Sequence, residues 1–251
     1  MKAFHNDPKI KTKYLARVRA HAAADQIIKG IYWENGKGCA VGCTIHSNDH
    51  SSYETELGIP MWLAYVQDRI FEGLNNGNAK RWPVEFLEAI APGQDLEKIK
   101  IPFLIFVLNF TLDKFDHKKH PKEKEAIVSV LNQFLKKTKM NEATLKKAQK
   151  ASYAVAYAAA SAAFASASAA DADASAAASA AAYASAAAAS AAANANANAA
   201  SASASASAAF AAAYAAAFAA VSGVAASAAR SSTYKLFADK IIELIKNNGG
   251  P

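Results

Sequence analysis

Residues 174–193 read ASAAASAAAYASAAAASAAA, and this stretch decides the fold class of the 251-residue chain. It is the centre of a longer segment, residues 151–229, in which 49 of 79 positions are alanine and only Asp171 and Asp173 are charged. Alanine has the highest helix propensity and loses no side-chain entropy when it is buried. We therefore predict an all-α protein in which alanine-rich helices pack closely against one another.

The alanine-rich segment contains its own break points. A single helix over 79 residues would be about 118 Å long at ~1.5 Å per residue, so helical hairpins are the favoured arrangement. Short polar side chains and glycine compete with helix at residues 171–173, 194–198 and 222–223. They divide the chain into similar segments, as in an antiparallel bundle, near residues 142–169, 174–193, 199–221 and 224–246.

Large side chains on these segments predict where helices or copies of the chain meet. In the last segment, an apolar stripe faces away from three lysines and is formed by Tyr234, Phe237, Ile241, Leu244 and Ile245. We expect the chain to form a homo-oligomer through the earlier segments. The residues expected to carry these assembly contacts are Tyr157, Phe164, Phe210, Tyr214 and Phe218.

Charge divides the chain in the same way as composition. Residues 1–150 hold 24 Lys and Arg against 17 Asp and Glu, whereas residues 151–251 hold four of each. We predict a helical head domain at residues 1–141 and an alanine-rich helical bundle at residues 142–251. The basic run Lys114–Lys150 could contact nucleic-acid phosphates. It lacks the aromatic and arginine pattern of a base-reading module, so a solvated helix face is the favoured interpretation.

The chain does not resemble a secreted or membrane protein. The first residues lack the apolar core of a secretory signal, and two cysteines four residues apart favour reduced thiols. We therefore expect a cytoplasmic protein. Residues 174–229 are uncharged and long enough to span a bilayer. Their repeated Ser and Asn side chains would be unsatisfied in lipid, so we expect no membrane partner.

The head has helical periodicity along most of its length. The spacing of apolar residues predicts helices at 10–29, 39–46, 61–73, 83–91, 101–115 and 121–137. We expect a loop at residues 34–38 and a capping box at Ser51-x-x-Glu54. Pro60, Pro83 and Pro121 suit the first turn of a helix.

Potential metal ligands are concentrated in the head. Cys39, Cys43, His46 and His50 step by four, three and four residues, and these side chains are typical zinc ligands. A helix would spread them over about 16 Å, so all four cannot hold one ion. We expect a pair of ligands joined by a residue from elsewhere, or else buried cysteines beside solvated histidines. The candidate ligands are Cys43, His46, His50, His21, Asp25 and Glu54.

Cys39 also has the setting of a nucleophile. It follows Gly36-Lys37-Gly38 at a predicted helix start, where the helix dipole and free amides lower the pKa of a thiol. His46 is a candidate base, as are His21 and His50, with Asp25 or Asp49 to orient it. Cys39 and His46 would then be the catalytic residues of a cysteine hydrolase or acyl transferase. The alternative is a buried cysteine after a glycine-rich turn.

The block GKGCAVGCTIH, residues 36–46, is followed by Asp49-His50, Tyr53-Glu54 and Glu56-Leu-Gly-Ile-Pro60. It resembles uncharacterised bacterial and phage proteins that pair such a head with an alanine-rich tail. The resemblance implies no activity, but it marks residues 39–60 as the defining part of the head.

Two functions follow from these patterns. The first is a self-associating structural or interaction protein whose alanine-rich helices are the assembly element. The second is a metal- or thiol-dependent hydrolase that uses the Cys/His cluster of the head. The sequence leaves open whether the protein is an enzyme.

Overall fold

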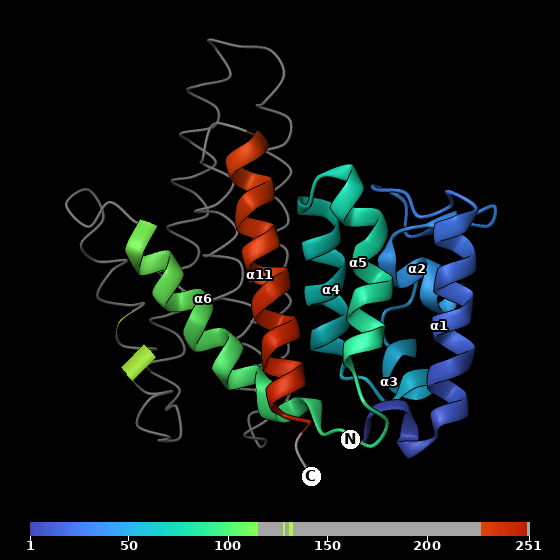
Figure 1. Cartoon of the computed structure of the whole chain (residues 1–251), viewed down its shortest axis with the longest axis horizontal. Coiled ribbons are helices and arrows are strands. Elements are labelled where there is room, and N and C mark those ends of the chain that lie inside the picture. The colour runs from blue at the N-terminus through green and yellow to red at the C-terminus, as the bar shows by residue number, and fades with distance from the viewer. Residues whose placement is uncertain (115–127, 129–130, 133–226, 250–251) are drawn as a thin grey trace, which may run out of the picture. The chain divides into compact units, whose positions relative to one another are not determined.

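The computed structural model describes residues 1–114, 128, 131–132 and 227–249. These residues are mostly helical, which confirms the predicted all-α class. The chain divides into two compact units, one formed by residues 1–103 with 227–251 and the other by residues 104–226. Figure 1 labels the main helices of the first unit. Its short elements are the 3-10 turns η1 (Ala3–Asn6) and η2 (Leu96–Ile99) and the strands β1 (Trp33–Glu34) and β2 (Lys37–Gly38).

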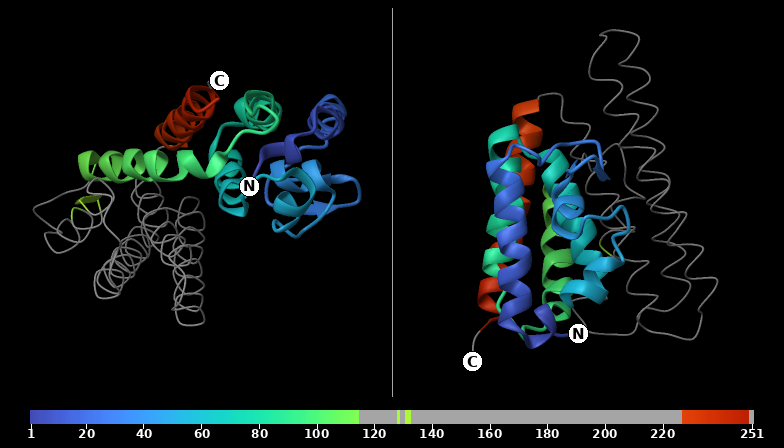
Figure 2. Two further views of the ribbon diagram at one scale, coloured as in Figure 1. Left: turned by 90° about the horizontal axis from the view of Figure 1, so that it is seen from below. Right: turned by 90° about the vertical axis from the view of Figure 1, so that its right-hand side faces the viewer.

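Long helices run side by side in the first unit, and their directions alternate in the order α11, α4, α5 and α1 in which Figure 1 shows them (Figures 1 and 2). In chain order they are α1 (Pro8–Ala23), α4 (Met61–Gly73), α5 (Asn76–Ala89) and α11 (Ser227–Asn247). α5 packs against both α1 and α4, and α11 packs against α4 and α5. The core between them is aromatic and aliphatic, and its largest fully buried side chains include Phe71, Trp82, Phe86 and Phe237.

α1 is shorter than the helix predicted at residues 10–29. It begins at Pro8, where the Asp7 side chain accepts a hydrogen bond from the Lys9 amide, and it ends at Ala23. The chain then turns at Asp25, whose φ of 55° is left-handed. The backbone of Gln26 and Ile28 pairs with Gly38, and these hydrogen bonds replace the last helical turns.

The loop predicted at residues 34–38 is a small hairpin. Trp33 pairs with Gly38 and Glu34 with Lys37, in antiparallel register. The turn residues Asn35 and Gly36 have φ of 50° and 78°. Two positive φ values are the signature of a type I′ turn, and Asn-Gly is its preferred sequence. The Asn35-Gly36 dipeptide could therefore have predicted this hairpin from the sequence.

Two short helices follow the hairpin and carry the chemistry-bearing residues. α2 (Ala40–Ile45) starts after Cys39 and ends at His46, as predicted, and all of its residues are buried. α3 (Ser52–Leu57) ends at Gly58, which adopts a left-handed φ of 60°. The predicted capping box is wrong, because the Ser51 side chain makes no cap hydrogen bond and its hydroxyl donates to Asp49.

The helix start predicted from Pro60 is confirmed, whereas the start predicted from Pro83 is wrong. Pro60 precedes α4, which spans the predicted residues 61–73. α5 begins at Asn76, two turns before the predicted start, because the Asn75 side chain caps the helix by accepting from the Asn78 amide. Pro83 lies inside α5, so the helix prediction at 83–91 was too short. α6 (Lys100–Lys114) matches the helix predicted at 101–115.

The unit of residues 1–103 and 227–251 differs from the predicted head domain, since it includes α11. The predicted apolar stripe of α11 is buried at Tyr234, Phe237, Ile241 and Ile245. Gly73 of α4 lies against the Tyr234 ring, where a Cβ atom would approach within 2.1 Å. The side chain of Gln94 donates to the Ile245 carbonyl at 2.5 Å, and the Asn248 side chain donates to the Asp95 carbonyl at 2.8 Å.

Several predictions lie outside the described residues. They are the helix at 121–137 apart from residues 128 and 131–132, the alanine-rich segments before residue 227, and the assembly residues Tyr157, Phe164, Phe210, Tyr214 and Phe218. In the part of the chain that is described, no helix is both long and apolar enough to cross a membrane.

Candidate functional site

The predicted Cys and His residues separate into two groups in the first unit. His21 and His46 meet beside the hairpin, and we call them the imidazole pair. Cys39 and His50 lie with three residues that the sequence analysis did not single out, and we call this group the interior polar cluster. Its members are Cys39, His50, Tyr53, Gln67 and Asp68.

The imidazole pair joins the end of α1 to the end of α2. His46 adopts a left-handed φ of 56° as the C-cap of α2, and its Nε2 lies 2.7 Å from Nε2 of His21. The other ring nitrogen of His21, Nδ1, donates to the Gln26 side-chain oxygen at 2.7 Å. In the neutral ring this leaves a lone pair on His21 Nε2, so the Nε2 hydrogen between the rings belongs to His46.

Trp33 covers the imidazole pair from the hairpin. Its ring stacks on His46, with centroids 4.3 Å apart and an interplanar angle of 11°, and meets His21 edge-on at 5.4 Å. Burial lowers the pKa of His46, and its interactions with the Arg17 guanidinium and with the His21 ring lower it further, against the opposing effect of Glu56.

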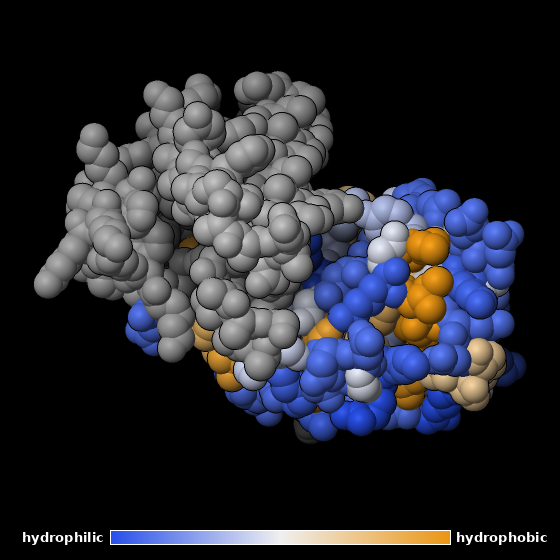
Figure 3. Space-filling view, turned by 90° about the horizontal axis from the view of Figure 1, so that it is seen from above, coloured by the Kyte–Doolittle hydropathy of each residue, from blue (hydrophilic) through white to orange (hydrophobic). Residues whose placement is uncertain are grey.

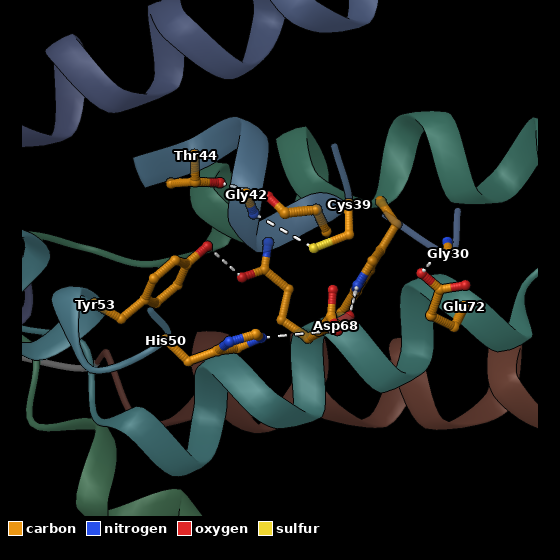
Figure 4. Close-up of polar contacts among 11 residues, drawn as sticks. Gly30, Cys39, Gly42, Thr44, His50, Tyr53, Asp68 and Glu72 are labelled. Atoms are coloured by element: carbon orange, nitrogen blue, oxygen red, sulfur yellow. Dashed lines mark hydrogen bonds and ion pairs between the residues drawn. The ribbon is translucent and has the colours of Figure 1, made fainter. Parts of the chain in front are cut away.

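The interior polar cluster lies where α2, α3 and α4 meet (Figure 4). The Cys39 sulfur accepts a weak hydrogen bond from the Gly42 amide at 3.4 Å, and its thiol interacts with the Asp68 carboxylate. His50 Nε2 lies 3.7 Å from Asp68 Oδ2. The Tyr53 hydroxyl donates to Gln67 Oε1 at 2.6 Å. The N-cap of α2, the approach to α3 and the middle of α4 thus place a thiol, an imidazole and a carboxylate together.

Within the part of the chain that the structure describes, three buried polar atoms of this cluster have no hydrogen-bond partner: His50 Nε2, Gln67 Nε2 and Asp68 Oδ1. Gln67 is fully buried and His50 is 7% exposed. His50 is held between two tyrosines, stacked on Tyr65 at 4.8 Å and edge-on to Tyr32 at 5.2 Å. Unpaired buried polar atoms are uncommon in proteins and frequently accompany a bound water, ligand or reactive group.

The predicted lowering of the Cys39 pKa is wrong in direction. Burial raises the pKa of this thiol, and the charge of Asp68 and its hydrogen bond raise it further. The Gly42 amide at the start of α2 acts in the opposite direction but is the weaker influence. Burial likewise raises the pKa of Cys43 to about 12. Both thiols are protonated at neutral pH.

The remaining candidate ligands lie apart from one another. The Cys43 thiol donates to the Gly38 carbonyl at 3.3 Å, Asp25 pairs with Lys80 at 2.5 Å, and Glu54 accepts from the Met61 amide at 2.9 Å. Asp49, the other proposed orienting group, accepts from Ser51. Among the residues described, no three His, Cys, Asp or Glu side chains gather to hold a metal ion. The predicted combination of a ligand pair with a third residue is therefore not formed there.

Gln67 and Asp68 could have been noticed in the sequence. In α4, Gln67 follows Leu63 by four residues and precedes Ile70 by three, so it falls on the apolar face of the helix. A polar residue at such a position needs an interior partner. The partner of Gln67 is Tyr53 in α3, and the partner of Asp68 is His50, just before α3. The spacing of residues within α4 cannot indicate either partner.

Comparisons with protein-family models, characterised proteins and solved structures find no match for this chain.

Proposed function

We propose that this is a self-associating structural protein, with the alanine-rich segment as its assembly element. One structural observation supports the proposal: residues on both sides of that segment, Phe103 before it and Phe237 after it, pack in the same unit with ring centroids 6.4 Å apart. In the sequence, the segment is thus inserted between the two parts of one folded unit, residues 1–103 and 227–251, which we call the frame.

The coloured part of the face drawn in Figure 3 offers little apolar surface for association. The face drawn in Figure 3 is mostly hydrophilic, with apolar residues in small groups among the residues that are coloured. The large apolar side chains exposed by more than a third in the described chain are Met1, Ile31, Tyr32, Met61, Tyr65 and Leu236. The aromatic residues of the alanine-rich segment are accordingly the favoured contacts, since aromatic side chains dominate interface energetics.

The test is the mass of the full-length protein in solution. We expect light scattering to show an oligomer for the natural sequence and a smaller species for the triple variant Phe210→Ala, Tyr214→Ala and Phe218→Ala. Alanine keeps the helix propensity of the segment, so the variant removes contacts without unfolding helices. Leu236→Ala, an exposed apolar change in α11, is the matched control. A monomeric natural protein, or an unchanged mass in the triple variant, contradicts the proposal.

A second candidate function rests on the interior polar cluster. We propose a thiol-dependent hydrolase in which Cys39 is the nucleophile, His50 the base and Asp68 the group that orients His50. The unpartnered atoms of His50 and Asp68 beside a thiol support this candidate. Because the pKa of Cys39 is raised, the thiol is protonated at rest, and in this candidate His50 accepts its proton as the sulfur attacks.

Alkylation of single-cysteine variants tests this candidate. Cys43→Ala leaves Cys39, and Cys39→Ala leaves Cys43 as the matched buried thiol. A reactive site predicts iodoacetamide labelling of Cys39 at least about tenfold faster than of Cys43 at pH 7.5, because His50 can accept the proton. His50→Asn should abolish the difference. Equal labelling, at a rate set by unfolding alone, excludes the hydrolase and leaves both cysteines as core residues.

A further inference from the structure

We propose that the imidazole pair binds one divalent transition-metal ion of the Zn²⁺ and Cu²⁺ class. Nε2 of His21 and Nε2 of His46 are the ligands, so the His46 proton moves from Nε2 to Nδ1 when the ion binds, and water fills the remaining positions. This site is separate from both candidate functions, because neither the assembly element nor the interior polar cluster includes either histidine.

The two ligand atoms already face one another. Zn–N bonds of about 2.05 Å at the tetrahedral angle separate two ligand nitrogens by about 3.3 Å. The observed separation is 2.7 Å, so an ion requires the rings to move apart by about 0.6 Å. His46 is exposed and His21 half-buried, which leaves room for water on the ion.

The hydrogen bonds around the pair favour metal ligation. Histidines that bind metal donate their other ring N–H to an oxygen, which fixes the tautomer and the ring orientation. His21 does so through Nδ1–H to Gln26 at 2.7 Å. The Gln26 backbone is fixed as well, since its carbonyl accepts from the Gly38 amide at 3.1 Å and its amide donates to the His21 carbonyl. Gln26 is therefore a positioning residue.

Charged side chains also lie near the pair. The Arg17 guanidinium, which donates to the Thr44 carbonyl at 2.9 Å, is the repulsive charge near the ion. Glu56 is the opposing negative charge near His46.

Trp33 provides a direct readout because its ring stacks on His46. Cu²⁺ bound at the pair would lie close enough to quench the Trp33 fluorescence. The experiment is a CuCl₂ titration of the full-length, tag-free protein, followed by fluorescence, with ZnCl₂ calorimetry as the measure of stoichiometry. We expect one ion per chain, and Trp33→Phe should remove the quenching while leaving the Zn²⁺ stoichiometry unchanged.

Asparagine variants isolate the ligands. His46→Asn preserves the left-handed backbone, which asparagine tolerates. We expect His21→Asn and His46→Asn each to weaken binding at least about tenfold, and Gln26→Leu to weaken it by about tenfold. His5→Asn is the matched control, because His5 has a similar φ of 51° and bonds the Thr55 carbonyl instead.

A second control is the double variant His117→Asn and His120→Asn, which removes the other histidine pair of the sequence. Loss of binding in that double variant, with binding retained in His21→Asn and His46→Asn, overturns the proposal. So does a natural protein that binds no ion. Circular dichroism of each variant distinguishes lost ligation from lost fold.

Discussion

At the scale of single residues, Gly42 is the most constrained position in the first unit. It lies in the middle of α2, and a Cβ atom built there would be 1.6 Å from the Tyr32 carbonyl oxygen. That oxygen belongs to the backbone and accepts from the Cys39 amide at 3.1 Å, so it cannot move without disturbing the start of α2. Gly42 thus lets the hairpin and α2 approach closely.

We predict that Gly42→Ala reverses the usual effect of this substitution. Alanine in place of helical glycine normally stabilises by about 0.5–1 kcal/mol. At Gly42 the overlap with Tyr32 should instead lower the free energy of unfolding by about 3 kcal/mol or more. Urea unfolding monitored by circular dichroism measures the change. Gly77→Ala in α5 is the control, since its Cβ meets no atom closer than 3.8 Å and the variant should be stabilised. A higher midpoint in both variants contradicts the prediction.

The thiol of Cys39 shows the limit of local inference at this scale. Its position at the start of a helix was predicted correctly from the preceding glycines. The direction of its pKa shift was not, because the dominant influences are burial and a carboxylate 29 positions later in the chain. Neither is visible in the spacing of residues 36–50. His21 and His46 were both candidate ligands, with His21 as a third ligand to a pair that contains His46, but the contact of His21 with Gln26 was not predicted.

At the scale of elements, α11 is an integral part of the first unit. Its buried stripe packs on α4 and α5, and Phe237 is fully buried while the adjacent Leu236 is 43% exposed. The Ser231 hydroxyl accepts from the Asn75 amide at 2.8 Å, at the turn between α4 and α5. Both ends of α11 are therefore tied to the frame.

We predict that Phe237→Ala lowers the free energy of unfolding of this unit by about 3–5 kcal/mol, through loss of burial and a cavity beside Phe103. Leu236→Ala should change it by less than about 0.5 kcal/mol, because an exposed side chain loses little contact. Urea unfolding followed through the fluorescence of Trp62 and Trp82, both buried in the unit, compares the two. Equal effects would show that α11 does not pack as described.

Periodicity predicted the elements unevenly for physical reasons. α4 and α6 were predicted well, because apolar runs with clear ends specify them. α5 was predicted too short, because an asparagine cap begins it and an internal proline was taken for its start. α1 was predicted too long, because backbone pairing between residues 26–28 and Gly38 ends it. The end of α1 is therefore decided by a contact with a distant segment, which the periodicity of residues 10–29 does not contain.

At the scale of the whole molecule, the sequence predicted the all-α class but divided the chain differently from the structure. Composition changes near residue 142, so a linear division into 1–141 and 142–251 followed from it. The structure instead groups residues 227–249 with residues 1–103. The amino-acid composition shows where the alanine-rich segment ends. It cannot indicate that α11, which follows, packs against α4 and α5. That grouping depends on shape complementarity, as at Gly73 and Tyr234.

The return of α11 to the frame also has a consequence for biosynthesis. The contacts of Asn75 with Ser231 and of Gln94 with Ile245 join positions 156 and 151 apart in the chain. A ribosome that has translated α4 and α5 must therefore complete the whole alanine-rich stretch before their apolar faces can be covered. At about 5–20 residues per second this interval lasts on the order of ten seconds. During it the nascent frame exposes the surface around Gly73, which the Tyr234 ring covers in the folded unit.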